Sequence, residues 1–287
     1  MQFLRNLLGR DKTAASTAEP AQPAAAAPRS KLTVGWATDV GEVRSHNEDT
    51  AFVVTSVLDG DESLPAFGLF ALADGMGGHQ AGEVASSLAA RAVTHYITRE
   101  FYLPILVRDE RDTGQPSLKE VLVDAVRAAN DMVAERVPGG GTTLTCALLL
   151  GPRAYIAHVG DSRAYVITET GDMEQITHDH SLVDRLVELG QLTRDEAAVH
   201  PQKNVLYRAV GQGGTLEVDT YVRTISGDEK LLLCSDGLWG MVDEAKIAEI
   251  VSTSPSLQKA CEKLVVAANH AGGRDNITAI LVAPPMV

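Results

Sequence analysis

The stretch FGLFALADG at residues 67–75 decides the fold, because an uncharged and mostly apolar run ends there in an aspartate followed by a glycine. A continuous apolar run of this length is typical of a strand buried on both faces. The pattern recurs in YIAHVGDS at residues 155–162 and in LLLCSDG at residues 231–237. In RDN at residues 274–276 it is inverted, because the aspartate precedes the apolar run. We therefore expect several aspartates to emerge from the ends of rigid strands.

These strand-end aspartates lie on separate segments of the chain, and they are Asp74, Asp161, Asp236 and Asp275. If the strands share one core, the carboxylates converge as in a site for Mg²⁺ or Mn²⁺, with water completing the coordination. Gly75 lets the backbone approach closely, so its carbonyl can serve as a further ligand. A single Asp-Gly pair after a strand is usually an ordinary turn. The recurrence of the pattern is what favours a metal site.

Strand and helix patterns alternate from Leu32 onward. Strand-like runs cover residues 32–38, 51–57, 67–73, 143–150, 154–159, 164–168, 216–224, 230–234 and 276–283, and helical patterns cover 81–101, 117–136, 244–253 and 256–271. Helices that arrive in pairs between runs of strands favour an α+β layered domain over a doubly wound sheet. The polar segment 180–209 contains two short helical stretches, and we expect it to form a flap over this domain.

Length and composition predict one catalytic domain preceded by a tail. The chain has 287 residues, of which 45% are hydrophobic, enough for a sizeable core. Residues 1–31 are rich in Ala and Pro and are expected to be a flexible linker, which leaves 32–287 as the domain. No apolar run approaches the ~20 residues of a membrane span, and no secretory signal is visible. Three cysteines without metal-ligand spacing indicate a reducing compartment, so we expect a cytoplasmic protein.

The charge of the chain limits its partners. The formal net charge is −13, and the first 31 residues are net positive, so the remainder is more acidic still. Nonspecific binding of nucleic acid relies on a basic surface, which argues against a nucleic-acid partner. Clustered carboxylates are tolerated when a metal ion neutralises them, so the acidity is compatible with divalent cations.

Taken together, the motifs resemble the metal-dependent protein phosphatases of type 2C, in particular their bacterial branch. The motifs that carry the resemblance, in chain order, are TDVG at 38–41, Arg44, NED at 47–49, DGMGGH at 74–79, GTT at 141–143, GDSR at 160–163, SDG at 235–237 and DN at 275–276. The resemblance spans residues 32–282. It implies two stacked mixed or antiparallel β-sheets flanked by paired helices, an αββα sandwich. It also implies hydrolysis of phosphoserine and phosphothreonine on proteins.

The resemblance assigns a role to each residue that matches a motif. It implies that Asp74 bridges two ions, Mn²⁺ or Mg²⁺, with the carbonyl of Gly75 on the first. Asp236 and Asp275 are expected to bind the second ion, and Glu48 to hold a metal-bound water. Two cations bridged by a carboxylate lower the pKa of water enough to supply hydroxide near neutral pH.

Three further residues match the family pattern around these ligands. Arg44 resembles the arginine that clamps the substrate phosphate, a task that suits its planar and permanently charged guanidinium. Asp161 resembles a ligand of a weaker third ion that is shared with Asp236. An alternative for Asp161 is a turn residue paired with Arg163. Asp49 is a weaker candidate for the shell around the ions.

The sequence departs from many eukaryotic relatives at one position. Those relatives have a histidine two residues after the bridging aspartate, proposed as the general acid, where this chain has Met76. His79 lies close in sequence, but the role is not transferred to it. A metal-bound water or another histidine such as His158 is the alternative source of the proton.

Two other classes of function stay open on the sequence alone. One is a pseudophosphatase, a binding module that retains the fold without turnover, and the other is a two-metal enzyme acting on nucleic acid. The intact aspartates argue against the first, and the acidic surface argues against the second. We expect the partners to be phosphorylated proteins and a cognate serine/threonine kinase, and the protein to be a monomer.

Overall fold

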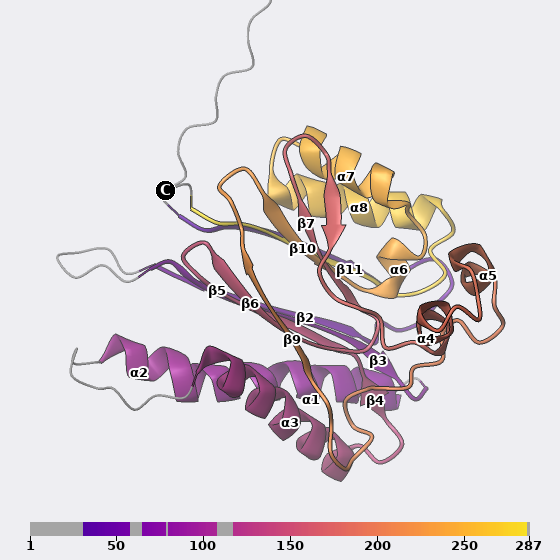
Figure 1. Ribbon diagram of the computed structural model, residues 1–287, viewed down its shortest axis with the longest axis horizontal. Coiled ribbons are helices and arrows are strands. Elements are labelled where there is room, and N and C mark those ends of the chain that lie inside the picture. The colour runs from indigo at the N-terminus through magenta and orange to yellow at the C-terminus, as the bar shows by residue number, and fades with distance from the viewer. Residues whose placement is uncertain (1–30, 58–64, 79, 108–116, 286–287) are drawn as a thin grey trace, which may run out of the picture.

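A computed structural model describes residues 31–57, 65–78, 80–107 and 117–285 (Figure 1). The predicted tail therefore lies outside the described residues, apart from Lys31. The expectation of two stacked sheets flanked by helices is confirmed, and every strand pairing is antiparallel. Within the described part of the chain, no helix combines the length and the apolar character that a bilayer crossing requires.

One sheet has the strand order β1-β11-β10-β7-β8 and the other has the order β2-β3-β5-β6-β9, with β4 paired to β3. The strands of the first sheet are β1 (Thr33–Asp39), β7 (Arg163–Ile167), β8 (Met173–Gln175), β10 (Lys230–Cys234) and β11 (Ile277–Ala283). Those of the second are β2 (Asp49–Ser56), β3 (Phe67–Met76), β4 (Gly141–Thr142), β5 (Leu144–Leu150), β6 (Arg153–Val159) and β9 (Asp219–Thr224). The short strand β8 was not predicted, and the run predicted to start at residue 216 becomes a strand only at Asp219.

Strand β3 is apolar on both faces because it packs against a separate core on each side. Leu69 and Ala71 point to the core shared with α1 (Gln80–Ile97) and α3 (Leu118–Arg136), whereas Phe70 and Leu72 point to the core between the two sheets. Alternate side chains of a strand leave on opposite faces, so both faces of β3 are buried. A third core lies between the other sheet and the helices α7 (Glu244–Thr253) and α8 (Leu257–His270).

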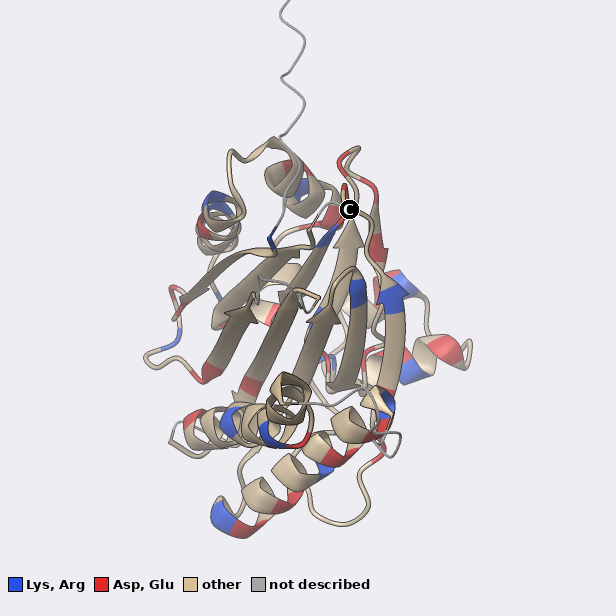
Figure 2. Ribbon diagram, turned by 90° about the vertical axis from the view of Figure 1, so that its left-hand side faces the viewer, with Lys and Arg blue, Asp and Glu red and all other residues tan. Residues whose placement is uncertain are grey.

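The helices carry charges of both signs on their surface. Figure 2 shows the strands largely free of Lys, Arg, Asp and Glu, while the outward faces of the helices carry both signs. Helix α3 begins where Ser117 and Glu120 form a reciprocal capping box, as the sequence pattern indicates. Each layer of helices therefore turns an apolar face to a sheet and a charged face to water.

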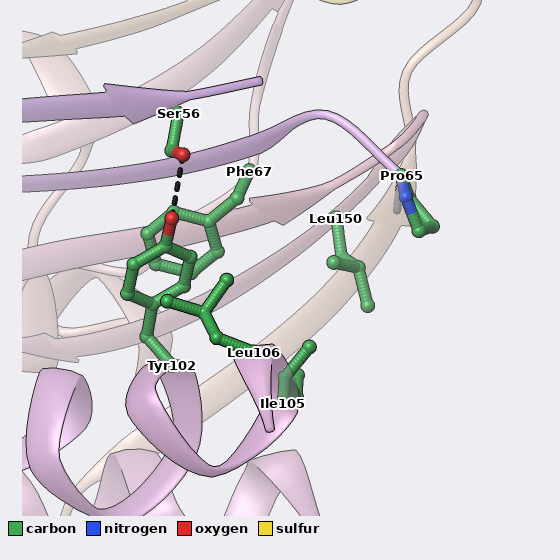
Figure 3. Close-up of a pocket in the computed structure, with 7 residues that line it drawn as sticks. All are labelled: Ser56, Pro65, Phe67, Tyr102, Ile105, Leu106 and Leu150. Carbon is green, nitrogen blue, oxygen red and sulfur yellow. Dashed lines mark hydrogen bonds between the residues drawn. The ribbon is translucent and has the colours of Figure 1, made fainter. Parts of the chain in front are cut away.

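The first helical segment does not run as one regular helix. Helix α1 passes into a π-helical turn, Thr98–Tyr102, and then into the short helix α2 (Leu103–Leu106), where the sequence predicted a single helix over 81–101. At this end the ring of Tyr102 stacks on Phe67, and its hydroxyl donates a hydrogen bond to Ser56 Oγ at 2.5 Å (Figure 3). The adjacent cavity of about 10 Å³ is barely large enough for one water. It lies at the end of β3 opposite the aspartate.

The segment predicted as a flap contains helices α4 (Leu182–Glu188) and α5 (Arg194–Ala198). The hydroxyls of Ser181 and Thr193 cap these two helices. Both helices lie to one side of the sandwich, beside the short helix α6 (Asp236–Trp239) (Figure 1).

Candidate metal centre

The predicted site residues meet in one cavity, because the strands that carry them end on the same edge of the sandwich. Asp74 lies near the end of β3, Asp161 follows β6, Asp236 begins α6 directly after β10, and Asp275 precedes β11. The cavity has a volume of about 130 Å³. Its lining residues are Arg44, Glu48, Asp74, Gly75, Met76, Thr143, Asp161, Asn204, Leu206, Asp236, Asp275 and Asn276. The residues predicted as metal ligands and the predicted phosphate clamp therefore all line it, whereas Asp49, the weaker candidate, does not.

Buried like charges dominate the electrostatics of this cavity. Burial raises the pKa of Asp74 well above its usual value, and the neighbouring carboxylates of Asp49, Asp236, Asp161 and Asp275 raise it further. Burial likewise raises the pKa of Asp49 to about 7 and that of Asp236 to about 6. Charges that are removed from water and left unpaired are costly, so this arrangement requires either protons or cations.

The donor set fits divalent cations. Asp49 Oδ1 and Asp236 Oδ1 are buried and accept no hydrogen bond, so each has an oxygen free for a ligand. All the charged donors are carboxylates, the oxygen ligands that Mg²⁺ and Mn²⁺ prefer. Among the residues described, no three His, Cys, Asp or Glu side chains are grouped so as to hold one ion between them. The remaining ligands would therefore be backbone carbonyls and water, which is the usual coordination of Mg²⁺.

Two threonines fix the backbone of Asp74. Its amide donates to Thr143 Oγ1 at 2.9 Å, and its carbonyl accepts the amide of Thr143 at 2.9 Å. The hydroxyl of Thr142 donates to the same carbonyl at 2.8 Å. Gly141-Thr142-Thr143 was recognised as a motif at the start of a predicted strand, and Gly141 and Thr142 form β4, but the sequence did not indicate that this segment positions Asp74.

Glycine is required where the end of β3 meets α1. The amide of Gly75 donates to the carbonyl of Glu48 at 3.0 Å. A Cβ on Gly75 would collide with the carbonyl of Gly82, and a Cβ on Gly82 would collide with the carboxylate of Glu48. The close approach brings the backbone of Gly75 and the side chain of Glu48 to the same cavity. Close backbone approach is one of the reasons for which only glycine is accepted.

Asn276 anchors the loop that carries Arg44 and Glu48. Its side-chain amide donates to the carbonyls of Val40 and His46, each at 2.9 Å, and its Oδ1 accepts the amide of Glu48 at 2.7 Å. Asn276 is 5% exposed, so these bonds are shielded from water. The sequence pointed to Asp275-Asn276 as a motif but did not indicate this anchoring role.

The arginines of the site do not form the ion pair between Asp161 and Arg163 that the sequence left open as an alternative. Arg163 forms its ion pair with Asp179, at 2.8 Å, and not with Asp161. Asp161 is therefore not a turn aspartate neutralised by Arg163 through direct contact. Arg44 Nη2 lies 2.6 Å from Asp275 Oδ2, which places the predicted phosphate clamp directly on a predicted metal ligand.

The structure rules out His158 as the proton donor at this cavity. Its side chain is fully buried, with Nδ1 hydrogen-bonded to Thr145 and Nε2 to the carbonyl of His178. Burial lowers the pKa of His158 to about 3, so the ring is neutral. Met76, which stands where many eukaryotic relatives have a histidine, lines the cavity. His79 lies outside the described residues.

Comparison with known proteins gives the family. A sequence model described as protein phosphatase 2C matches residues 45–281. The chain belongs to the protein phosphatase 2C family. The resemblance inferred from the motifs is thereby confirmed.

Several curated and solved relatives of this type 2C chain are bacterial. The serine/threonine phosphatase stp of Listeria innocua is 39% identical over 246 residues, which is 85% of this chain and 93% of the relative. The crystal structure of the Mycobacterium tuberculosis serine/threonine phosphatase PstP/Ppp superposes with a TM-score of 0.72 at 36% identity, covering 88% of this chain and 99% of that one. The PstP catalytic domain in complex with two manganese ions gives a TM-score of 0.68 at 36% identity, over 88% and 97% of the chains.

Proposed function

We propose that the protein hydrolyses phosphoserine and phosphothreonine on other proteins, using divalent cations. The observation that carries the proposal is the cavity itself, in which aspartates from four strand ends surround a space beside Arg44. The family supports the reaction, because its bacterial relatives are serine/threonine phosphatases by name. The complex of PstP with two manganese ions supports the cofactor.

The carboxylates and one carbonyl are the proposed ligands of two Mn²⁺ or Mg²⁺ ions. Asp74 would contribute to both sites, the carbonyl of Gly75 to the first, and Asp236 and Asp275 to the second. Since no three acidic side chains of the described residues are grouped around one point, binding of the second ion would draw these carboxylates together. Glu48 orients a water molecule beside them. When bound, such ions lower the pKa of water and neutralise the charge of a phosphoryl group. Thr142 and Thr143 support this by holding the backbone of Asp74, as described above.

Arg44 is the proposed phosphate clamp. Half of its side chain is exposed, and its guanidinium reaches the edge of the cavity from a loop. Two N–H groups of one arginine can meet two phosphate oxygens at once. An incoming phosphate would therefore compete with Asp275 for Arg44, which would leave the Asp275 carboxylate free to bind an ion.

Asp161 is the proposed ligand of a third and weaker ion, together with Asp236. Burial raises the pKa of Asp161 well above its usual value, and the charge of Asp236 is the next largest cause. Direct pairing with Arg163, the competing explanation, is absent, since Arg163 is bonded to Asp179. A cation between Asp161 and Asp236 would relieve this repulsion.

The wider setting of the enzyme is also part of the proposal. We infer a catalytic unit over residues 32–287, with 180–209 as the flap, because both sheets and the whole cavity are built from this part of one chain. That composition of the cavity supports a monomer. The free cysteines Cys146, Cys234 and Cys261 support a cytoplasmic location, where thiols stay reduced. A substrate phosphorylated on Ser or Thr implies a partner kinase of that class.

Release of inorganic phosphate tests the proposal against its two alternatives. The protein should dephosphorylate a phosphothreonine peptide in the presence of Mn²⁺, and it should leave a single-stranded oligonucleotide intact. Binding of the peptide without turnover would identify a pseudophosphatase. Cleavage of the oligonucleotide alone would identify a nuclease.

A further inference from the structure

A groove of about 590 Å³ extends from the carboxylate cavity along the flap. Helices α4 and α5 contribute one side of its lining, and α6 with the following residues contributes another (Figure 1). The groove and the cavity are continuous, because both are lined by Arg44, Asp161, Asn204, Asp236 and Asp275. A chain bound along this groove would therefore have one residue at the carboxylate cavity.

Three exposed cations line this groove away from the carboxylates: Arg194 on α5, Lys203 in the flap and Arg274 before β11. Within the described residues, none of the three has an ion-pair partner or a side-chain hydrogen bond. The other two cations of the groove are already committed, Arg44 to Asp275 and Arg163 to Asp179.

The acidic residues of the groove do not cancel these cations. Asp161, Asp236 and Asp275 belong to the proposed metal sites, and Asp179 is paired with Arg163. Asp184 is the one remaining carboxylate of the lining, and burial raises its pKa while Arg194 lowers it. The outer groove thus presents a net positive wall on a protein whose formal net charge is −13.

Apolar surface completes the groove and is held in a fixed orientation. Val183 and Val187 line it from α4, and Trp239 lines it from α6. The indole Nε1 of Trp239 donates to the carbonyl of Asp161 at 3.1 Å, and the guanidinium of Arg163 lies 3.5 Å from the centre of its ring. A groove lined by both apolar and charged side chains is suited to an extended peptide that presents aliphatic and charged side chains.

We propose that this groove binds the substrate segment next to the phosphorylated residue, and that Arg194, Lys203 and Arg274 select segments rich in Asp and Glu. The inference rests on the proposed function, because the phosphorylated residue itself must occupy the carboxylate cavity. Charge complementarity carries it, since a basic peptide would meet three cations on this path. Opposite charges along the path both steer encounter and fix the register of the bound chain.

Matched peptides test the selection. Phosphothreonine peptides of one length, flanked by Asp, by Ala or by Lys, are compared by kcat/KM in Mn²⁺. Screened ion pairs are individually weak, so we expect the Asp-flanked peptide to exceed the Ala-flanked one by about three- to tenfold and the Lys-flanked one to be poorest. The difference should shrink as salt is raised.

A charge-reversal pair of variants separates the groove from net charge. The groove variant carries Arg194→Glu, Lys203→Glu and Arg274→Glu. The control carries Arg91→Glu, Lys119→Glu and Lys263→Glu, which are exposed positions on α1, α3 and α8. The groove variant should lose or reverse the preference, whereas the control should keep it. Both should hydrolyse an aryl phosphate like the parent, because Arg194, Lys203 and Arg274 lie outside the carboxylate cavity that this small substrate occupies.

The outcomes distinguish this inference from the function on which it rests. Hydrolysis of all three peptides at equal rates, or loss of the preference in the control variant as well, would overturn the selection while leaving the phosphatase intact. Failure to hydrolyse any peptide and the aryl phosphate would overturn both.

Discussion

Arg44 is the residue at which substrate recognition and metal binding meet. Replacing it with alanine removes a charge-assisted contact to phosphate, so kcat/KM for a phosphothreonine peptide should fall by roughly 10- to 100-fold, mostly through KM. Metal affinity should persist, because the carboxylates remain. The kcat/KM of Arg44→Lys should fall between that of the parent and that of Arg44→Ala, since a lysine keeps the charge but loses the planar fork. Calorimetry with Mn²⁺ is the check, and a loss of binding as severe as in Asp275→Asn would show that Arg44 is misassigned.

Asp161 tests the third ion. In Asp161→Ala the two central ions should stay bound, while hydrolysis slows because a positioned water near the leaving oxygen is lost. The loss should be larger for a phosphothreonine peptide, whose alkoxide needs a proton, than for an aryl phosphate, whose leaving group is already stable. Rates on both substrates across a Mn²⁺ titration decide the matter. Equal losses would remove the leaving-group role, and no loss would make Asp161 a structural turn residue.

Individual site residues could be predicted from sequence when they directly follow an apolar, strand-like run. Asp74, Asp161 and Asp236 each follow an apolar run, and the structure brings all three to one cavity. The roles of Thr142 and Asn276 could not be predicted, because each acts on a backbone group distant in sequence. A threonine or asparagine outside a recognisable strand end gives no pattern until the chain has folded.

At the scale of elements, the anchoring of the Arg44 loop to the start of β11 is the contact that positions the site. Asn276→Ala removes all three side-chain hydrogen bonds to that loop and leaves a buried amide and two carbonyls without partners. We expect a loss of about 1–3 kcal/mol in the free energy of unfolding, together with weaker recognition of phosphate. Urea denaturation and KM measure the two effects. Unchanged KM in a variant of lowered stability would show that the loop keeps its position without Asn276.

Element boundaries were less predictable than element types. The first helix breaks into α1, a π-helical turn and α2, and at this break Tyr102 packs against Phe67 and Ser56. Those partners lie on strands far away in sequence, so helical periodicity over 81–101 gives no sign of the break. Strand β8 has only 3 residues and acquires its structure from pairing with β7.

For the molecule as a whole, the cluster of buried carboxylates couples metal binding to pH. The folded pKa of Asp49 is about 7 against a usual 3.8, so between these values the folded protein holds a proton that the unfolded chain releases. This contribution to the stability of the metal-free protein falls as pH rises towards 7, which is the opposite of an ordinary salt-bridged aspartate. Cations must displace such protons, so Mn²⁺ should bind more tightly as pH rises.

The corresponding measurement is the increase in melting temperature caused by Mn²⁺. It should be larger at about pH 7.5 than at about pH 5.5, because fewer protons compete. The lowered pKa of His158 makes stability rise with pH below about 6.5, but it acts with and without Mn²⁺ and cancels in the difference. An increase that is independent of pH would mean that the ions do not bind at these carboxylates.

The central claim is that the buried aspartates serve a metal-dependent phosphatase, and Asp74 tests it most directly. Phosphate release from a phosphothreonine peptide is measured across a Mn²⁺ titration for the parent protein and for Asp74→Asn. The parent should gain activity with Mn²⁺ and lose it in chelator, and the variant should be at least about 100-fold slower at every Mn²⁺ concentration. The variant should still fold, because removing one of several buried like charges relieves repulsion in the metal-free protein. Activity of the parent that survives exhaustive chelation, or full turnover by Asp74→Asn, would contradict the account.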